Sequence, residues 1–233
     1  MEPSVEGPTA QPGLVAVAVQ ATEASVGVSQ ALRSRVFWLL ALSTSLNMIA
    51  QSALVVHAIP HLTGVGMPST LAATAIAGMT TISVAGRLGF GWLGDRLQKR
   101  YVLALLFGLQ IAGLIVFASL SEPWHLIPFL ALYAPSYGGA IPLRPSIQGE
   151  YFGRRAFGSI QGVMMGCTSV GGVLGPIFAG WVFDLVGSYR VAFLVLAAVV
   201  AAAVPAILAL PPSPRTHVDT QPASATIERR HGS

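Results

Sequence analysis

Apolar residues run along this chain in long uninterrupted stretches. Six of these stretches reach about 20 residues or more, the second of them by continuing past one arginine, Arg87, and charged residues, prolines or both bound each of them. A helix of about 20 apolar residues crosses the roughly 30 Å hydrocarbon core of a bilayer. The stretches lack the alternation of a transmembrane barrel strand, so the pattern predicts an all-α membrane protein. Its six transmembrane helices are expected at about 36–59, 70–94, 101–121, 124–143, 156–183 and 191–210.

The two ends of the chain have a different composition from this predicted membrane domain of 32–210. Residues 1–31 are rich in Ala, Gly, Ser, Pro and Gln, and 211–233 contains prolines and scattered polar residues. Such segments bury too little apolar surface to fold alone. We expect a flexible cytoplasmic leader or linker at 1–31 and a disordered cytoplasmic tail at 211–233.

Overall composition supports a lipid environment. Only 9% of the residues are charged and 53% are hydrophobic, whereas soluble domains carry about 25% charged residues. The single cysteine, Cys167, lies in an apolar stretch, which excludes a disulfide framework and a cysteine-based metal site.

The basic residues indicate the orientation in the membrane. They gather before the first predicted helix, in alternate loops and after the last helix: Arg33, Arg35, Arg96, Lys99, Arg100, Arg144, Arg154, Arg155, Arg215, Arg229 and Arg230. The opposite loops carry only Arg190. Because cytoplasmic loops are enriched in Lys and Arg, both termini are expected in the cytoplasm, and the expected location is the plasma (inner) membrane.

The same distribution argues against other classes of function. Basic residues dispersed over loops are explained by topology without a nucleic-acid partner. The sequence has no G-x-S-x-G elbow and no H-E-x-x-H, motifs that mark hydrolases and metalloproteases. We therefore expect neither an enzyme nor a cofactor.

The most informative segment is G-R-L-G-F-G-W-L-G-D-R-L-Q-K-R at 86–100. Its Gly89, Gly91 and Gly94 fit G-x-G-x-x-G, but a dinucleotide site must follow a strand and open a helix, whereas these glycines close an apolar stretch. Small residues here favour close approach of two membrane helices.

Residues 91–100 resemble the signature of the major facilitator superfamily, Gly-x-Leu-Ala-Asp-Arg-x-Gly-Arg-Lys/Arg. The chain reads Gly91-Trp92-Leu93-Gly94-Asp95-Arg96-Leu97-Gln98-Lys99-Arg100. The glycine-rich fifth stretch also looks like a family element. The resemblance implies one six-helix half of that fold, the carboxyl-terminal one, with a linker-like start.

In that family this loop is a conformational latch, which implies such a role for Gly91, Asp95, Arg96, Lys99 and Arg100. Asp95 is then expected near the start of the fifth helix, around 156–159, because a helix amino terminus favours an anion. The alternative is that Asp95 and Arg96 only end the helix and fix topology.

Arg87 is the first candidate for solute binding. It lies inside the second predicted helix, about 12 Å from Asp95 at helical rise, and an arginine at the bilayer centre costs at least about 2.5–3.5 kcal/mol. Its position resembles that of the arginine that holds the substrate carboxylate in the monocarboxylate and oxalate/formate branches. Those monocarboxylate carriers have an aspartate one turn earlier, where this chain has Ser83. Alternatively, Arg87 extends to the headgroups or serves only the latch.

Further polar residues are weaker candidates. His57 is expected near an outer cavity, and its spacing from His61 suggests a metal pair, but Pro60 and the lack of a third ligand argue against a metal site. The cavity contacts are expected from Asn47, Gln51, Tyr133, Tyr137 and Gln161, which equally suit bonds between helices.

Together these features predict a secondary transporter, or half of one, that moves a small organic solute, a carboxylate being one option, by alternating access. The substrate site of such transporters lies between two halves. The expected partners are therefore the bilayer, the solute, and either a missing amino-terminal half or a second copy of the chain. The alternative is a non-transporting six-helix membrane fragment or assembly subunit.

Overall fold

The computed structural model describes residues 27–153 and 156–213. This part of the chain is helical and contains no strand. Six of its helices are long and apolar enough to cross a membrane, which confirms the predicted fold class. The helices are α2 (Val28–Leu32), α3 (Arg35–Gly64), α4 (Ser69–Arg96), α5 (Lys99–Ala118), η1 (Pro123–His125), α6 (Leu126–Phe152), α7 (Phe157–Val186) and α8 (Tyr189–Leu208).

The largest difference from the predicted boundaries concerns α6. The sequence analysis ended this helix at residue 143 and placed Arg144 in a cytoplasmic loop, but α6 continues to Phe152. Proline lacks an N–H donor, yet Pro142 and Pro145 lie inside the helix, as membrane helices allow when neighbours satisfy the freed carbonyls. Gly153 ends it with φ 72°, a conformation that glycine adopts without strain. The loop assignment of Arg144 was therefore wrong.

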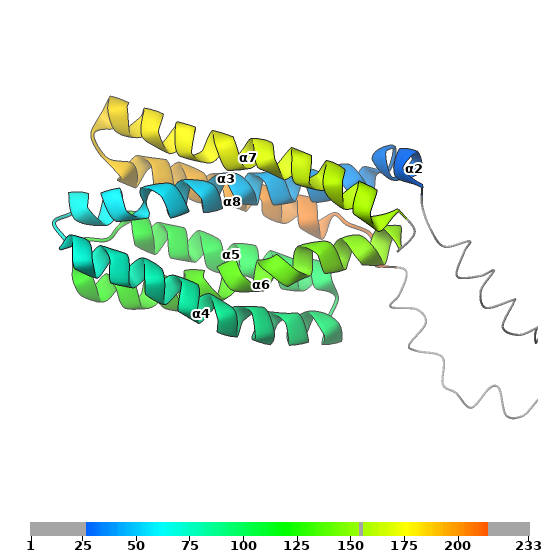
Figure 1. The fold of residues 1–233 in the computed structure, drawn as a ribbon, viewed down its shortest axis with the longest axis horizontal. Coiled ribbons are helices and arrows are strands. Elements are labelled where there is room, and N and C mark those ends of the chain that lie inside the picture. The colour runs from blue at the N-terminus through cyan, green and yellow to red at the C-terminus, as the bar shows by residue number, and fades with distance from the viewer. Residues whose placement is uncertain (1–26, 154–155, 214–233) are drawn as a thin grey trace, which may run out of the picture.

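The helices pack mainly in two close pairs, α4 with α6 and α3 with α7, while α5 packs against α6 and α8 (Figure 1). Glycines make both pairs possible. A Cβ atom added to Gly138 of α6 would overlap the Ser83 backbone of α4, and one added to Gly175 of α7 would overlap the Ile49 carbonyl of α3. Close backbone approach at small residues is a general way of packing membrane helices.

The outer faces of α4 and α7 remain uncovered. Only 28% of the most apolar part of α4 and 22% of that of α7 is buried, against 44–50% for the other four membrane helices. Glycines with open space beside them lie on both helices, among them Gly89 and Gly91 on α4 and Gly158, Gly162 and Gly166 on α7. These two faces can accept further helices at close distance.

The described chain starts and ends at the same end of the bundle (Figure 1), as an even number of spans requires. The short helix α2 lies beside the start of α3, where the Trp38 indole N–H donates to the Leu32 carbonyl at 2.9 Å. The expected flexible leader and tail fall largely outside the described residues.

Candidate functional site

Arg144 stands at the centre of a polar network inside the bundle. Its Nη2 donates to Gln51 Oε1 at 3.1 Å and also to Asn47 Oδ1. Asn47 in turn donates from Nδ2 to Gln110 Oε1 of α5. Three membrane helices, α3, α5 and α6, thus contribute to one cluster.

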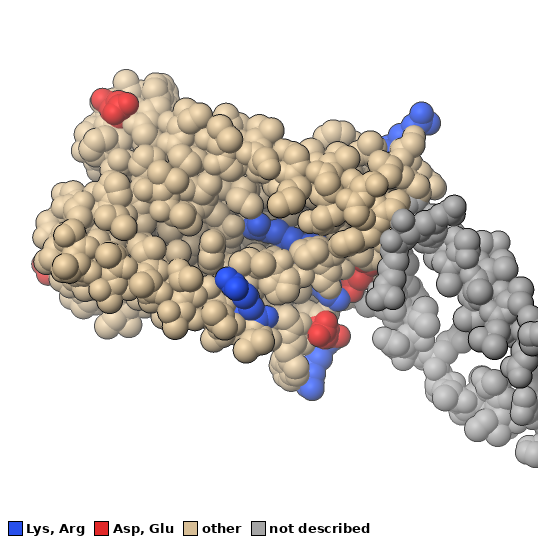
Figure 2. Space-filling model, viewed as in Figure 1, with Lys and Arg blue, Asp and Glu red and all other residues tan. Residues whose placement is uncertain are grey.

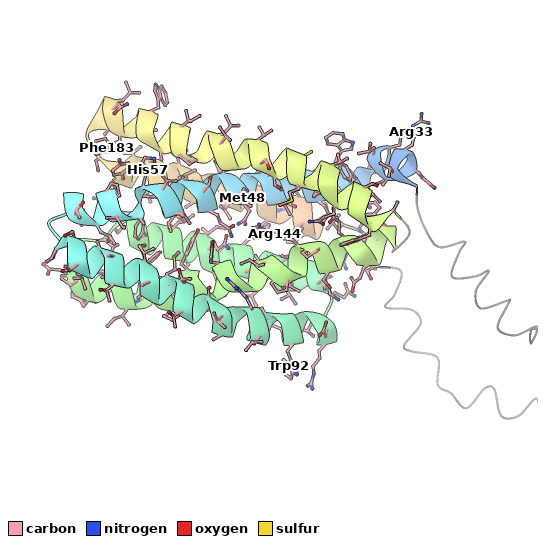
Figure 3. The ribbon with its side chains drawn as sticks, in the orientation of Figure 1. Arg33, Met48, His57, Trp92, Arg144 and Phe183 are labelled. Carbon is pink, nitrogen blue, oxygen red and sulfur yellow. The ribbon has the colours of Figure 1, made fainter. Side chains whose placement is uncertain are left out.

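The helix direction explains how Arg144 reaches this depth. Side chains on a helix tilt toward its amino terminus, so the guanidinium lies closer to the middle of the bundle than the Arg144 backbone does. Asn47 and Gln51 lie near the middle of α3, and Figure 3 shows Arg144 in the central part of the bundle, with Met48 beside it.

All hydrogen-bond partners of Arg144 in the described structure are uncharged. The only salt bridge among the described residues joins Lys99 and Glu150. On the face shown in Figure 2, basic atoms lie in a hollow near the middle, while the visible acidic atoms lie toward the ends. A cation at this depth without an acid is costly, so the site favours an anionic ligand.

Two of the predicted cavity residues, Asn47 and Gln51, are therefore brought together by Arg144. Both are buried, with Asn47 fully so. Tyr133 and Tyr137 lie close enough to Arg144 for electrostatic interaction, and the buried Tyr133 hydroxyl has no hydrogen-bond partner among the described residues. Gln110 was not predicted as a site residue, although a lone glutamine in an apolar run was a usable signal.

A pocket of about 240 Å³ adjoins the network between α3, α6 and α7. Its polar lining includes Arg144, Gln148 and Gln161, and its apolar lining includes Met48 and Met164. Gln161 was a predicted cavity contact, and the structure places it here.

Arg87 occupies a different environment from Arg144. It is exposed on α4, and no hydrogen bond or salt bridge joins it to another described residue. The neighbouring Gly86 packs against the backbone of Pro135 on α6, which places Arg87 beside the line of contact between α4 and α6. Its guanidinium is available to a solute or to a further helix.

His57 makes hydrogen bonds within the bundle. Its Nδ1 lies 3.1 Å from the Tyr189 hydroxyl and its Nε2 lies 3.0 Å from the Pro176 carbonyl oxygen. With both ring nitrogens occupied, this geometry favours joining α3 to α7 and α8. His61 Nε2 instead contacts the Phe117 carbonyl at 2.9 Å, and no group of three possible metal ligands occurs among the described residues.

The basic residues of the predicted latch connect the ends of several helices. Lys99 Nζ pairs with Glu150 Oε1 of α6 at 2.6 Å. Arg100 Nη1 donates to the Leu210 carbonyl after α8 at 2.5 Å. Arg96 lies over the Trp92 ring at 3.9 Å from its centroid, an attractive cation–π contact.

The acidic partner of this cluster is Glu150. No hydrogen bond or salt bridge joins Asp95 to another residue in the described ranges, the start of α7 included. The packing explains this, because α4 lies mainly against α6 and α7 mainly against α3. Gly91 lies beside open space.

Comparison with known proteins finds relatives that share the name monocarboxylate transporter. Monocarboxylate transporter 12 of Rattus norvegicus is 30% identical over 162 residues, which cover 68% of this chain and 33% of that protein. The human protein of the same name is also 30% identical, with 68% and 31% covered. Monocarboxylate transporter 13 of Bos taurus is 26% identical over 158 residues, covering 67% and 37%. The chain thus spans about a third of the length of these relatives.

Solved structures share the fold. A single-residue variant of the E. coli fucose:proton symporter FucP superimposes with a TM-score of 0.63 at 22% identity, over 77% of this chain and 44% of the symporter. FucP in the outward conformation gives a TM-score of 0.65 at 21% identity, over 80% and 45%. The family profile described as Major Facilitator Superfamily matches residues 40–230. With six membrane helices arranged as in about half of a FucP chain, this protein belongs to the Major Facilitator Superfamily.

Proposed function

We propose that the chain is one six-helix half of a secondary transporter that moves a small organic anion, a carboxylate, by alternating access. The observation that carries the proposal is the pair of intramembrane arginines, Arg87 and Arg144, neither of which has an acidic partner in the described structure. A guanidinium can hold a carboxylate with two parallel hydrogen bonds. The names of the relatives, monocarboxylate transporters, support the same class of solute.

The uncovered faces of α4 and α7 support a second six-helix unit as partner. Transporters of this kind bind solute between two halves near the bilayer midplane, and these are the two membrane helices with the least burial. The partner is an amino-terminal half or a second copy of the chain. We place the chain in the plasma (inner) membrane with both termini on the cytoplasmic side. We assign Gly91, Asp95, Arg96, Lys99 and Arg100 to the conformational latch.

The test is uptake in the source organism, which supplies any second half. The chromosomal gene is altered in place to give Arg87→Ala or Arg190→Ala, or is deleted, and uptake of radiolabelled pyruvate, lactate and acetate is compared with that of the unaltered strain. We expect Arg87→Ala to lower uptake at least about tenfold, since it removes a charge-assisted bond worth about 1.5–3 kcal/mol. Arg190 is exposed at the start of α8, so its variant should match the wild type. Uptake that is equal with and without the gene would favour the non-transporting alternative.

A further inference from the structure

The pocket between α3, α6 and α7 contains polar atoms that the protein itself does not satisfy. Arg144 Nε and Gln148 Nε2 are buried donors without a partner in the described structure, and Gln161 Oε1 is a buried acceptor without one. All three side chains line the pocket, and Gln148 is only 3% exposed. Buried polar groups are nearly always hydrogen-bonded, so these three atoms suit a polar group bound in the pocket.

The hydrogen bonds of Arg144 leave two of its three guanidinium nitrogens without a partner in the described structure. Nη2 is held by Asn47 and Gln51, whereas Nε and Nη1 donate no hydrogen bond to another described residue. The Asn47 and Gln51 contacts therefore fix the orientation of the Arg144 guanidinium without neutralising its charge. A fixed guanidinium with a free N–H at Nε and at Nη1 can donate a charge-assisted hydrogen bond to an oxyanion from either nitrogen.

The remaining lining describes the rest of the ligand. Leu40, Met48, Ile141, Met164 and Met165 supply an apolar wall, and methionine side chains adapt to irregular shapes. The volume of about 240 Å³ lies just below the roughly 300–1,000 Å³ of pockets for drug-sized ligands. The occupant is accordingly small and has one anionic end and one apolar end.

We infer that Arg144 and Gln148 form an anion-binding site for the carboxylate of the transported solute, separate from Arg87 on the exposed face of α4. The Gln161 Oε1 acceptor in the same pocket suits a hydroxyl group or water beside the anion. The inference rests on the proposed function for the identity of the solute as the transported species. The binding site itself requires only the described chain. Asn47 and Gln51 are positioning residues, because they act through Arg144.

The test uses the reactivity of a cysteine placed in the pocket. Thr168 lines the pocket on α7, so Thr168→Cys is built in a Cys167→Ser background and purified in detergent. Its reaction rates with an anionic and a cationic thiosulfonate reagent are compared. With Arg144 present, we expect the ratio of anionic to cationic rates to exceed by about tenfold the ratio in Arg144→Gln, because a unit charge acts strongly at short range in a low-dielectric site.

The matched control is Val173→Cys in the same background, since Val173 is 61% exposed on α7 and does not line the pocket. Its rate ratio should be the same with Arg144 and with Arg144→Gln. Sodium pyruvate, compared with sodium chloride at equal ionic strength, should slow the reaction of Thr168→Cys and should lose this protection in Arg144→Gln and in Gln148→Leu.

Two results would overturn the inference. One is an equal rate ratio for Thr168→Cys with and without Arg144, and the other is the absence of protection by pyruvate, acetate and benzoate alike. Because labelling needs no transport, pyruvate protection in a chain that fails the uptake test would instead count against the proposed function. Circular dichroism of each variant verifies that the helices are retained.

Discussion

Arg87 and Arg144 are the same residue type inside neighbouring helices and both lack an acidic partner in the described structure, yet they differ in exposure and in hydrogen bonding. Arg87 is exposed on α4 without a hydrogen bond to another described residue, whereas Arg144 is held by two side chains of α3. The role of the exposed Arg87 therefore depends on the solute or helix that packs against this face of α4. A cation oriented by fixed amides already has its geometry set in this half alone.

The strongest way to disturb both arginines is to separate the helix pair that carries them. In Gly138→Ala, the new Cβ would overlap the Ser83 backbone of α4, and overpacking costs about 1–3 kcal/mol or more. We expect a marked fall in the thermal unfolding temperature of the purified protein. Gly89→Ala on the open side of α4, where nothing lies within 4 Å, should leave it unchanged. An equal effect of the two substitutions would show that the close contact of α4 and α6 is not formed.

A second substitution places an acidic side chain beside Arg144 and leaves Arg87 unchanged. In Asn47→Asp the carboxylate faces the guanidinium, and Gln110 can turn its unpartnered Nε2 toward the new acceptor. We expect the unfolding temperature to hold or rise, while pyruvate protection of Thr168→Cys weakens about tenfold, or about 1.4 kcal/mol.

Asn47→Leu serves as the control for Asn47→Asp. It removes the acceptor from Arg144 without supplying a charge and leaves a buried donor unpaired, at a cost of about 1–3 kcal/mol. Its unfolding temperature should fall. If Asn47→Asp lowered the unfolding temperature as much as Asn47→Leu, a carboxylate at this position would not stabilise Arg144.

The smallest effect is expected where a cation already has its acid. Lys99 and Glu150 join α5 to α6 at 2.6 Å with partly exposed side chains, and such pairs contribute about 0.2–1 kcal/mol. Lys99→Gln and Glu150→Gln should each lower the unfolding temperature slightly, and the double variant should lower it no further than one of them. Additive losses in this cycle would show that the two residues stabilise the protein independently.

The sequence allowed the six helices to be predicted because long apolar runs are a strong signal. It misplaced the end of α6 because a charge near a proline normally marks a loop. What keeps Arg144 inside is a set of amides on α3 and α5, distant in sequence, and neither periodicity nor composition reports such neighbours. For the same reason Asn47 and Gln51 could be named as polar candidates, but Gln148 and the partner of each amide could not.

At His57 the sequence suggested a binding role, whereas the structure shows hydrogen bonds between helices. A histidine in an apolar helix invites a functional reading, and only the approach of Tyr189 and the Pro176 carbonyl shows that both ring nitrogens are occupied. The latch motif also needed the structure. Its signature located the basic residues, but the acidic partner of Lys99, Glu150, comes from α6.

The network around Arg144 also has an order in time. Asn47, Gln51 and Gln110 all precede Arg144 in the chain, so the ribosome synthesises α3 and α5 before α6 exists. A helix that carries an arginine inserts at a penalty, and here the amides that solvate the charge have been synthesised before it. Reversing that order, by circular permutation for instance, would bring Arg144 into the lipid before the amides that solvate it.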